Sequence, residues 1–535
     1  MPSHPTHDQA ALIAALLQPA CYPHPVTTVT HLQTHISHIL LAGDYAYKIK
    51  KPVNLGFLDF TSLARRRYYC EEELRLNRRL APELYLACLP IGGDSHHPRL
   101  GDPTDAPIEY AVQMRRFAQE ALLDRVLDAG GLQPRHLDAL ARRLAAFHRS
   151  VPAAAPSTPF GLPDRVLQPM LDDFTHVRPR LSDPAELEQL ATVERWTLAA
   201  SEQLRPQLLE RKAGGWIREC HGDLHLGNMV LSEDGQITIF DCIEFNDPFR
   251  WIDVISDLAF LIMDLRFRGA GDLAQRALNV YLEYSGDFAG VALLDYYQVY
   301  RAMVRAKVYA IQSGQDGITA AARAAARDRC LGYLRLALTL THASSPFLLI
   351  THGVSGSGKS HQTGQLLEKF PGAIRLRSDV ERKRLFGLGP LDDSRSQLGK
   401  GLYSSTANAR TYRRLQRLAD GLLAAGLPVL VDATFMKRAH RQPFRELAAR
   451  HGVPFILLDC RADPATLRAR VAARHQRGDD ATEADIEVLE RQLHFDEPPT
   501  ADENPLPGND EQDLERVRAA IVAAMARPPA TSDIQ

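Results

Sequence analysis

Apolar positions change their spacing along the chain, and each change marks a different kind of element. Residues 37–51 predict two short strands that turn at Gly43-Asp44, and residues 61–80 carry leucines at helical spacing. From residue 136 to about 340 the patterns are mainly helical, with one strand-and-turn interruption at residues 221–241. The first part of the chain is therefore expected to be a strand-rich lobe followed by a helical lobe.

A run of small and polar residues, THASSP at 341–346, separates this region from a second pattern. Beyond it, apolar strand candidates at residues 347–351, 429–431 and 455–458 alternate with helical stretches, which indicates a parallel sheet. A chain of 535 residues is also too long for one core of ordinary size. We expect an α+β domain at residues 1–342 (small lobe about 1–117, helical lobe about 118–342), an α/β domain at 343–500, and an acidic helix and tail at 501–535.

Composition is that of an ordinary globular protein, with 45% apolar and 24% charged residues. The longest strongly apolar segment, residues 258–265, is interrupted by Asp264 and is too short to span a bilayer. We find no secretory signal at the start of the chain. The seven cysteines are scattered and never form a Cys-x-x-Cys pair, which favours reduced thiols. We expect a cytoplasmic protein with no membrane span.

The net charge of -2 conceals an asymmetry, because residues 375–477 hold 21 Lys and Arg against 9 Asp and Glu. The field of this stretch would attract an anionic substrate, and a nucleic-acid end is one such acceptor. The alternative is that many of these arginines form solvated helix faces, neutralised by the acidic stretch that begins at Asp479. Both interpretations stay open.

The string GVSGSGKS follows an apolar strand and opens onto a helical pattern, which is the context of a phosphate-binding loop. Its glycines let backbone N–H groups surround phosphate oxygens, its lysine reaches the terminal phosphates, and its last serine coordinates magnesium. ATP and Mg²⁺ are the expected ligands. The residues assigned to the nucleotide are Gly353, Val354, Ser355, Gly356, Ser357, Gly358, Lys359 and Ser360.

Residues downstream of this loop favour a kinase. Asp379 and Arg382 are three residues apart, so a carboxylate that can deprotonate a hydroxyl lies beside a guanidinium that can hold an anion. A surface ion pair is the alternative for that spacing. Asp432 ends a strand at the ligand-binding edge of the sheet. Arg470 and Arg474 lie on a helix that resembles a lid over phosphates.

Together these residues resemble the small P-loop kinases related to polynucleotide kinase, gluconate kinase and the zeta toxins, over residues 347–493. The resemblance implies that Asp379 is the general base, that Arg382 and Asp432 contact substrate, and that Arg470 and Arg474 are lid arginines. It does not carry over an acceptor, because the acceptor-binding region matches no member of the group distinctively.

A second constellation is HGDLHLGN at residues 221–228, followed by ITIFD at 237–241. Asp223 can accept the proton of an attacking hydroxyl, and Asn228 and Asp241 offer oxygen ligands to Mg²⁺. We expect His221 to hydrogen-bond the loop as a scaffold and give His225 no chemical role. Two hard-oxygen ligands and a base suffice for phosphoryl transfer.

This region resembles the aminoglycoside phosphotransferases and related protein-kinase-like small-molecule kinases, more faintly over residues 32–340. The resemblance implies that Lys48, chosen over Lys50, touches nucleotide phosphates from a strand, with Glu73 on the next helix as its ion-pair partner. Residues 110–117 would form the hinge that contacts adenine. Ordinary solvated charges are the alternative for Lys48 and Glu73.

The sequence departs from that family in one loop and one motif. No GxGxxG string covers the phosphates in the first lobe, and Cys242 and Ile243 follow Asp241 where protein kinases have Phe-Gly. Asp253 and Asp257, in the helix WIDVISDLAF, are expected to be structural anchors near the loop.

We therefore predict two fused phosphotransferase modules that transfer the γ-phosphate of ATP to hydroxyl groups. Sugars, aminoglycoside-like compounds, nucleosides and nucleic-acid ends are the acceptors considered. Two alternatives stay open. In one alternative, the first module is a nucleotide-binding regulatory domain, as the missing glycine loop suggests, and only the P-loop module is an enzyme. In the other, the P-loop module is an ATP-driven switch that acts on a partner.

Overall fold

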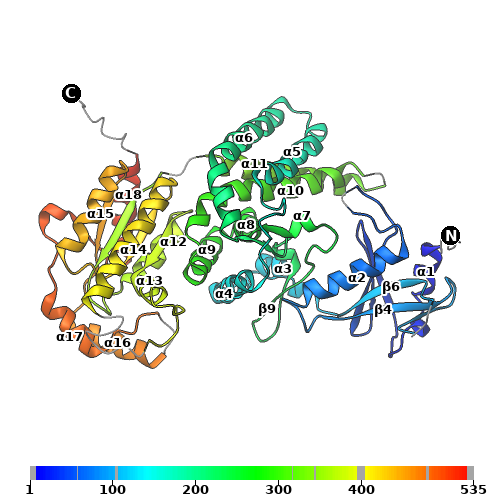
Figure 1. Ribbon diagram of the computed structural model, residues 1–535, viewed down its shortest axis with the longest axis horizontal. Coiled ribbons are helices and arrows are strands. Elements are labelled where there is room, and N and C mark those ends of the chain that lie inside the picture. Colours follow the sequence, from blue (N-terminus) through cyan, green and yellow to red (C-terminus); the bar gives the residue numbers. More distant parts are fainter. Residues whose placement is uncertain are drawn as a thin grey trace. The chain divides into compact units, whose positions relative to one another are not determined.

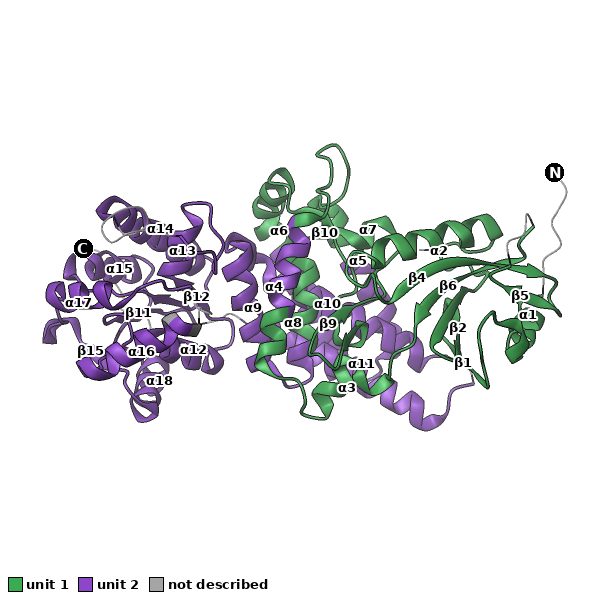
Figure 2. Ribbon diagram, turned by 90° about the horizontal axis from the view of Figure 1, so that it is seen from below, with its two compact units in different colours: residues 1–139, 150–169, 201–264 green, residues 140–149, 170–200, 265–535 purple. Residues whose placement is uncertain are grey.

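The computed structural model describes residues 8–56, 58–102, 106–315, 317–342, 345–394, 404–477 and 481–526. The chain forms two compact units (Figure 2). The first unit comprises residues 1–139, 150–169 and 201–264, and the second comprises 140–149, 170–200 and 265–535. The tail predicted from about Pro528 lies outside the described residues.

An antiparallel sheet with the strand order β1-β2-β3-β6-β4-β5 forms the small lobe of the first unit. The predicted strand pair is present as β2 and β3, on either side of Gly43 and Asp44. Strand β3 pairs with β2 and β6, so both of its edges are covered. The strands are β1 (Val29–Gln33), β2 (Ser37–Ala42), β3 (Tyr45–Lys50), β4 (Tyr85–Gly93), β5 (Pro98–Leu100) and β6 (Glu109–Arg115).

Helix α2 (Leu63–Asn77) packs against β4 and β6 (Figure 1). Its leucines made it recognisable, but its buried face also includes Arg66, Cys70, Glu73 and Asn77. These positions recur at helical spacing, so they share one side of the helix. Charged side chains are rarely buried unless they are paired. The face of α2 that meets the sheet is therefore a polar face that needs partners.

Two short strand pairs interrupt the helical part of the chain. One lies within residues 221–241, as the pattern there predicted, and the other flanks that segment and was not predicted. Strand β7 (Ile217–Glu219) pairs with β10 (Trp251–Asp253), and β8 (Met229–Leu231) pairs with β9 (Ile237–Ile239), both antiparallel. The β8–β9 pair brings residues 228 and 241 to the same end. The helices are α1 (Gln9–Ala15), α3 (Leu123–Asp128), α4 (Pro134–Ser150), α5 (Pro163–Val177), α6 (Pro184–Ala213), α7 (Asp247–Arg250), α8 (Val254–Phe267), α9 (Gly271–Ser285), α10 (Leu294–Ser313) and α11 (Ala320–Leu340).

A parallel sheet with the order β12-β13-β11-β14-β15 lies in the second unit. Helices α12, α14 and α15 pack against it (Figure 1). Its strands are β11 (Leu348–His352), β12 (Ile374–Arg377), β13 (Val429–Asp432), β14 (Phe455–Asp459) and β15 (Pro505–Pro507). Its helices are α12 (Lys359–Lys369), α13 (Ser378–Arg384), α14 (Ser405–Ala424), α15 (Arg438–Arg450), α16 (Pro464–Arg477), α17 (Ile486–Phe495) and α18 (Glu511–Met525). Because all strands run the same way, their carboxyl ends meet at one edge, where ligands of such sheets bind.

Residues after 500 add to this sheet and to its core. Strand β15 pairs in parallel with β14, and Leu514, Val517 and Ile521 of α18 join the core cluster that contains Phe347. The sequence predicted an acidic helix here but no strand, because the three residues of β15 include two prolines, which cannot donate to a ladder. The apolar face of α18 therefore stabilises the P-loop sheet.

Two further observations bear on the class of protein. None of the described helices is long and apolar enough to cross a membrane. All seven cysteines are free thiols, and five of them are buried.

Ile521→Ala should lower the free energy of unfolding of the second unit by about 2–5 kcal/mol, because it opens a cavity in a packed core. Hydrogen exchange of the β11 amides in urea measures this loss. Val522→Ala is the matched control, since Val522 is 49% exposed on the same helix and should change stability by less than about 0.5 kcal/mol. Equal effects of both variants would contradict the packing of α18 on this core.

Candidate active sites

A fully buried carboxylate, Glu73 of α2, lies between two lysines of β3. Its Oε1 is 2.8 Å from Nζ of Lys48 and its Oε2 is 2.7 Å from Nζ of Lys50. The two lysines are two residues apart on a strand, so both point to the face that α2 covers. The structure thus brings Lys48 and Glu73 together as predicted and adds Lys50 as a second partner of the same carboxylate.

The loop that follows β9 supplies two more carboxylates to these lysines. Nζ of Lys48 is 2.6 Å from Oδ1 of Asp241, and Lys50 pairs with Glu244. Burial would raise the pKa of Glu73, but the two ammonium groups lower it to about 2. Burial would lower the pKa of Lys48, but Asp241 and Glu73 raise it well above its ordinary value. Glu73 and Lys48 therefore keep their charges at neutral pH.

Asp241 has a backbone conformation that is uncommon for a non-glycine residue, with φ of 63°. Its N–H donates to the hydroxyl of Tyr85 at 3.2 Å, and the next N–H, of Cys242, donates to Oδ1 of Asn77 at 2.8 Å. The side chain of Asp241 is 43% exposed although its lysine partner is nearly buried. The carboxylate thus faces solvent from a fixed backbone, as a metal ligand requires.

Asp223 and Asn228 lie in one loop between β7 and β8. The amide of Asn228 donates to the Asp223 carboxylate at 2.9 Å and to its carbonyl at 3.0 Å, and Nε2 of His225 is 3.4 Å from the same carboxylate. His221 bonds the carbonyl of Phe240 at 2.9 Å, which joins the loop to the end of β9. His221 therefore has the scaffold geometry that the sequence suggested.

Buried carboxylates of α8 hold the backbone of this loop. Asp257 accepts from the N–H groups of His221 and Gly222 at 3.0 and 2.8 Å, and Asp264 accepts from the N–H of Leu226 at 3.0 Å. Gly222 has φ of 88°, and a Cβ there would lie 2.6 Å from the carbonyl oxygen of Phe249. The anchoring expected of Asp257 is present, and Asp264 adds a second anchor.

The residues assigned to metal in the first unit offer only oxygen donors. The carboxylate of Asp241 and the amide of Asn228 are hard ligands of the kind that Mg²⁺ prefers. Asp223 lies in hydrogen-bond contact with Asn228, so a base and a ligand are adjacent. The donor set fits Mg²⁺, which would neutralise phosphate charge between these residues.

The phosphate-binding loop joins β11 to α12, as the string predicted. Gly353, Gly356 and Gly358 have φ of 138°, 83° and 100°, and a Cβ on Gly353 would lie 2.3 Å from the carbonyl oxygen of Cys460. Nζ of Lys359 donates to the carbonyl of Val354 at 2.8 Å, so the lysine lies across the loop. Burial lowers the pKa of Lys359 despite the opposing effect of Asp432. The loop has the tight wrap that requires glycine.

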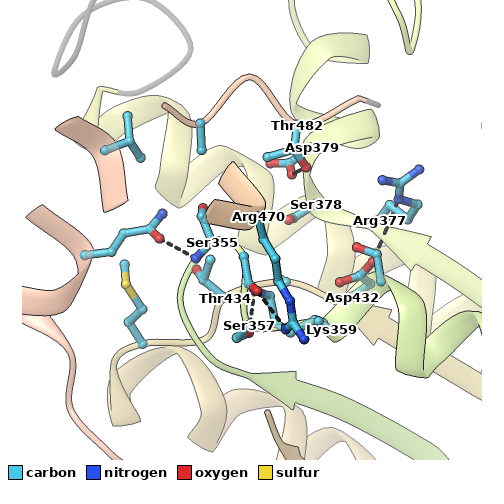
Figure 3. A pocket seen from close by; sticks show the side chains of 18 of the residues that line it. Ser355, Ser357, Lys359, Arg377, Ser378, Asp379, Asp432, Thr434, Arg470 and Thr482 are labelled. Atoms are coloured by element: carbon cyan, nitrogen blue, oxygen red, sulfur yellow. Dashed lines mark hydrogen bonds and ion pairs between the residues drawn. The ribbon is translucent and has the colours of Figure 1, made fainter. Parts of the chain in front are cut away.

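A pocket of about 920 Å³ opens above this loop. Figure 3 shows Thr482 next to Asp379, and Thr482 donates a hydrogen bond to that carboxylate. Nη2 of Arg382 donates to Oδ1 of Asn408 at 3.2 Å. The predicted residues that line the pocket are Ser355, Gly356, Ser357, Gly358, Lys359, Ser360, Asp379, Arg382, Asp432, Arg470 and Arg474. Gly353 and Val354 are not among the residues that line this pocket, and Val354 packs in an apolar cluster.

Both predicted lid arginines of α16 reach backbone carbonyls. Nη1 of Arg470 donates to the carbonyl of Gly356 at 3.3 Å, directly on the phosphate-binding loop (Figure 3). Nη2 of Arg474 donates to the carbonyl of Ala484 at 2.8 Å, away from the loop. In addition, Gln492 of α17 accepts from the N–H of Ser355 at 2.7 Å. Helices α16 and α17 therefore each contact the phosphate-binding loop through one side chain.

Asp432 ends β13 and is 4% exposed. Its Oδ2 has no hydrogen-bond partner among the described residues, and Nε of Arg377 is 3.8 Å away (Figure 3). A buried carboxylate oxygen without such a partner is costly, and a divalent cation with oxygen ligands would satisfy it. Asp432 and the Ser360 hydroxyl, which line the same pocket, therefore fit Mg²⁺.

His352, the last residue of β11, links two carboxylates just before the phosphate-binding loop. Its Nδ1 is 2.8 Å from Oδ1 of Asp459, and its Nε2 is 3.1 Å from Oδ1 of Asp496, which follows α17. Burial would lower the pKa of His352, but these hydrogen bonds raise it. The imidazolium therefore ties the end of α17 to the sheet.

Several residues of both sites were missed in the sequence. Glu244 and Arg377 lie just outside motifs that were recognised, and their partners are far away in the chain. Asp264 had a visible signal, because it interrupts an otherwise apolar run. Thr482 and Gln492 had none, since single polar residues on the helices and loops that cover a pocket look like solvated ones.

The folds and sites define a protein-kinase-like α+β domain of the aminoglycoside phosphotransferase type, followed by a P-loop α/β domain. Comparison with protein families agrees: residues 57–294 match the phosphotransferase enzyme family APH, and residues 348–499 match an AAA domain family. The uncharacterized protein Rv2004c of Mycobacterium tuberculosis is 32% identical over 480 residues, covering 89% of this chain and 93% of that protein. The chain belongs to the family that includes Rv2004c.

Solved structures are also similar to part of the chain. A choline/ethanolamine kinase family protein from Mesorhizobium loti is 15% identical, with a TM-score of 0.36, and covers 62% of this chain and 98% of its own. The amicoumacin kinase hAmiN, solved with AMP-PNP, Ca²⁺ and Ami, is 15% identical with a TM-score of 0.37, and covers 61% and 94%. A likeness of this degree says nothing about the substrate of the present chain.

Glu73→Gln should lower the free energy of unfolding of the first unit by about 3–5 kcal/mol, because it leaves buried ammonium groups without their shared carboxylate. Hydrogen exchange of the β3 amides measures the loss. Glu71→Gln is the matched control from the same glutamate run, since Glu71 pairs with Arg67 on the exposed side of α2 and should leave exchange unchanged. A similar, small effect of both variants would contradict the shared-carboxylate arrangement.

The raised pKa of His352 predicts a pH-dependent stability of the second unit. The imidazolium contribution is complete below the pKa of an unfolded histidine, about 6.5, and is lost as pH rises through the higher folded pKa. The stability difference between wild type and His352→Gln should therefore shrink as pH rises through the raised pKa of the folded histidine, as measured by urea unfolding at several pH values. Asp496→Asn should retain part of the dependence. Parallel curves for wild type and His352→Gln would exclude the linkage.

Proposed function

We propose that each of the two domains is an ATP-dependent phosphotransferase that uses Mg²⁺ and transfers the γ-phosphate of ATP to a hydroxyl group. The observation that carries the proposal is that residues far apart in the sequence lie close together in each site. In each unit, side chains from separate stretches of the chain, recognised by different motifs, lie near one another and have the chemistry to serve as a base, a cation for phosphates and oxygen ligands for a metal. Phosphoryl transfer needs little else, because positioning and charge stabilisation supply most of the catalysis.

In the first site, Lys48 would hold nucleotide phosphates, and Asn228 and Asp241 would hold Mg²⁺. Asp223 would accept the proton of the acceptor hydroxyl, and its contact with the Asn228 amide at 2.9 Å supports this role, since it keeps the base beside the metal ligands. Glu73 orients Lys48 without touching substrate.

In the second site, the glycine-rich loop and Lys359 would hold the phosphates, and Ser360 and Asp432 would hold Mg²⁺. Asp379 would act as the general base, oriented by Thr482. Arg382 would bind an anionic acceptor or the transferred group. Arg470 contacts the loop already and would stabilise charge in the transition state.

The acceptors that fit are hydroxyl-bearing small molecules for both sites. The P-loop pocket is lined by more cations than one nucleotide needs, among them Arg382, Lys437 and Arg491. This surplus favours an acceptor that itself carries negative charge, and a nucleic-acid end belongs to that class. Binding of a nucleic acid would weaken steeply with salt.

A second candidate function leaves catalysis to the P-loop domain alone and makes the first domain a nucleotide-binding regulator. One observation favours it. Strands β1, β2 and β3 are joined by short turns, so no glycine-rich loop long enough to cover phosphates lies among them.

The proposal is tested by following γ-labelled ATP into a library of hydroxyl compounds with the full-length protein. Asp223→Asn should lower transfer at the first site by roughly 10²- to 10⁴-fold, as expected for loss of a general base, and leave the second site active. Lys359→Ala should do the reverse, because the P-loop loses its phosphate-binding lysine. The double variant provides the blank.

Two matched controls lie outside the sites. Asp234→Asn changes an exposed carboxylate in the β8–β9 turn, and Lys369→Ala changes an exposed lysine at the other end of α12; neither should alter transfer. If wild type passes label only to water, the kinase assignment fails. If Lys359→Ala binds nucleotide but transfers to no acceptor, the regulatory function of the first domain is favoured.

A further inference from the structure

Helix α9 lies against the P-loop sheet within the second unit, beside α12 and β12 (Figure 1). Strand β12 is at the edge of that sheet, and polar side chains of α9 satisfy the backbone where it begins. Gln275 accepts from the N–H of Gly372 at 2.9 Å, and Asn279 accepts from the N–H of Arg375 at 2.8 Å. Both also donate to the carbonyl of Ala373. Side chains of α9 thus fix the start of an edge strand.

One turn further along α9, Glu283 reaches two arginines of β12. Its side chain is 8% exposed. Its Oε1 is 2.9 Å from Nη2 of Arg375, and its Oε2 is 3.5 Å from Nη1 of Arg377. Its backbone carbonyl accepts from Nη2 of Arg384 at 2.5 Å. A single buried carboxylate therefore fixes two guanidinium groups that follow one another on the same face of β12.

Each of these two guanidinium groups also lies close to a residue of the P-loop site. Nη1 of Arg375 donates to the carbonyl of Ser360 at 3.3 Å, and Nε of Arg377 is 3.8 Å from Oδ2 of Asp432. Ser360 and Asp432 are the residues proposed to hold Mg²⁺ there. Glu283 is therefore connected to each proposed metal ligand through one arginine: to Ser360 through Arg375 and to Asp432 through Arg377.

We propose that Glu283 is a positioning residue of the P-loop site, contributed by the part of the chain that matches the phosphotransferase family. It holds Arg377 at a distance from Asp432 and so keeps the carboxylate oxygen available to Mg²⁺. This inference rests on the proposed nucleotide site at Gly353 to Ser360. The residue touches neither nucleotide nor metal, and it acts through Arg377.

The physical reason is competition between two cations for one carboxylate. Attraction between opposite charges strengthens as their separation and the local dielectric fall, and Asp432 is almost completely buried. With Glu283 neutral, one negative charge that attracts Arg377 is removed, so the guanidinium is drawn more strongly toward Asp432, where its charge opposes a bound Mg²⁺. Nucleotide binding without metal does not involve this competition.

The test compares wild type with Glu283→Gln in the full-length protein, by calorimetric titration of a non-hydrolysable ATP analogue over a range of Mg²⁺ concentrations. The same titration of Lys359→Ala gives the signal of the first site, which is subtracted. The half-saturating Mg²⁺ concentration at the P-loop should rise roughly 10-fold or more in Glu283→Gln, as for other residues that orient metal ligands. Affinity in EDTA should stay within about twofold, since no metal ligand is then engaged.

Two further variants separate positioning from folding. Arg377→Gln, alone or combined with Glu283→Gln, removes the competing cation and should not raise the Mg²⁺ requirement above that of wild type. Glu503→Gln breaks another buried pair of the same unit, in which Arg441 contacts Glu503 at 2.7 and 2.8 Å, and should affect binding equally with and without Mg²⁺.

Three results would overturn the inference: an unchanged Mg²⁺ requirement in Glu283→Gln, an equal loss of affinity with and without Mg²⁺, or an increase in Arg377→Gln as large as in Glu283→Gln. The proposed function fails separately. In that case wild type and Lys359→Ala give the same titration, because the P-loop binds no nucleotide at all.

Discussion

The first unit depends on a buried negative charge, the carboxylate of Glu73, which is shared by Lys48 and Lys50. Removing such a group from water is expensive, and only close pairing with good geometry compensates for it. Because each lysine also contacts a carboxylate of the loop after β9, the sheet, helix α2 and that loop cannot shift independently. A displacement of any one of them would leave a charge buried without a partner. The position of Asp241 follows from this constraint.

The second unit repeats the arrangement with different residues. Glu283 lies between Arg375 and Arg377, and these arginines, like Lys48 and Lys50, are two residues apart on a strand. The period of a strand places both cations on one face, so one carboxylate on a covering helix can meet both. In each unit one cation of the pair also lies near an aspartate that is proposed to hold metal: Lys48 is 2.6 Å from Asp241, and Arg377 is 3.8 Å from Asp432. A buried carboxylate behind the cations thus fixes their position while the aspartate faces the ligand.

What could be predicted from the sequence was whatever lies within a short string. The loop at Gly353 to Ser360 and the loop around Asp223 carry their chemistry in neighbouring residues, so spacing alone identified them. Glu283 is different, because no residue near it in the chain indicates that its partners lie on β12, about 90 residues further along the sequence. Arg375 and Arg377 looked like part of a positive surface, yet their charge is compensated by that distant carboxylate. Pairing between remote segments is a property of packing, and local patterns do not contain it.

The two sites also resemble each other in their backbone, because each has a strained residue just after a strand. Asp241 and Phe435 follow strands β9 and β13 and have φ of 63° and 42°, which costs each on the order of 1–3 kcal/mol. In both places a tyrosine hydroxyl accepts the N–H of the strained residue, Tyr85 at 3.2 Å and Tyr412 at 3.1 Å. Such strain persists only where the surroundings hold it, and both tyrosines are buried. The turns that carry Asp241 and follow Asp432 are therefore fixed before any ligand binds, so little reorganisation remains for the phosphate and metal to induce.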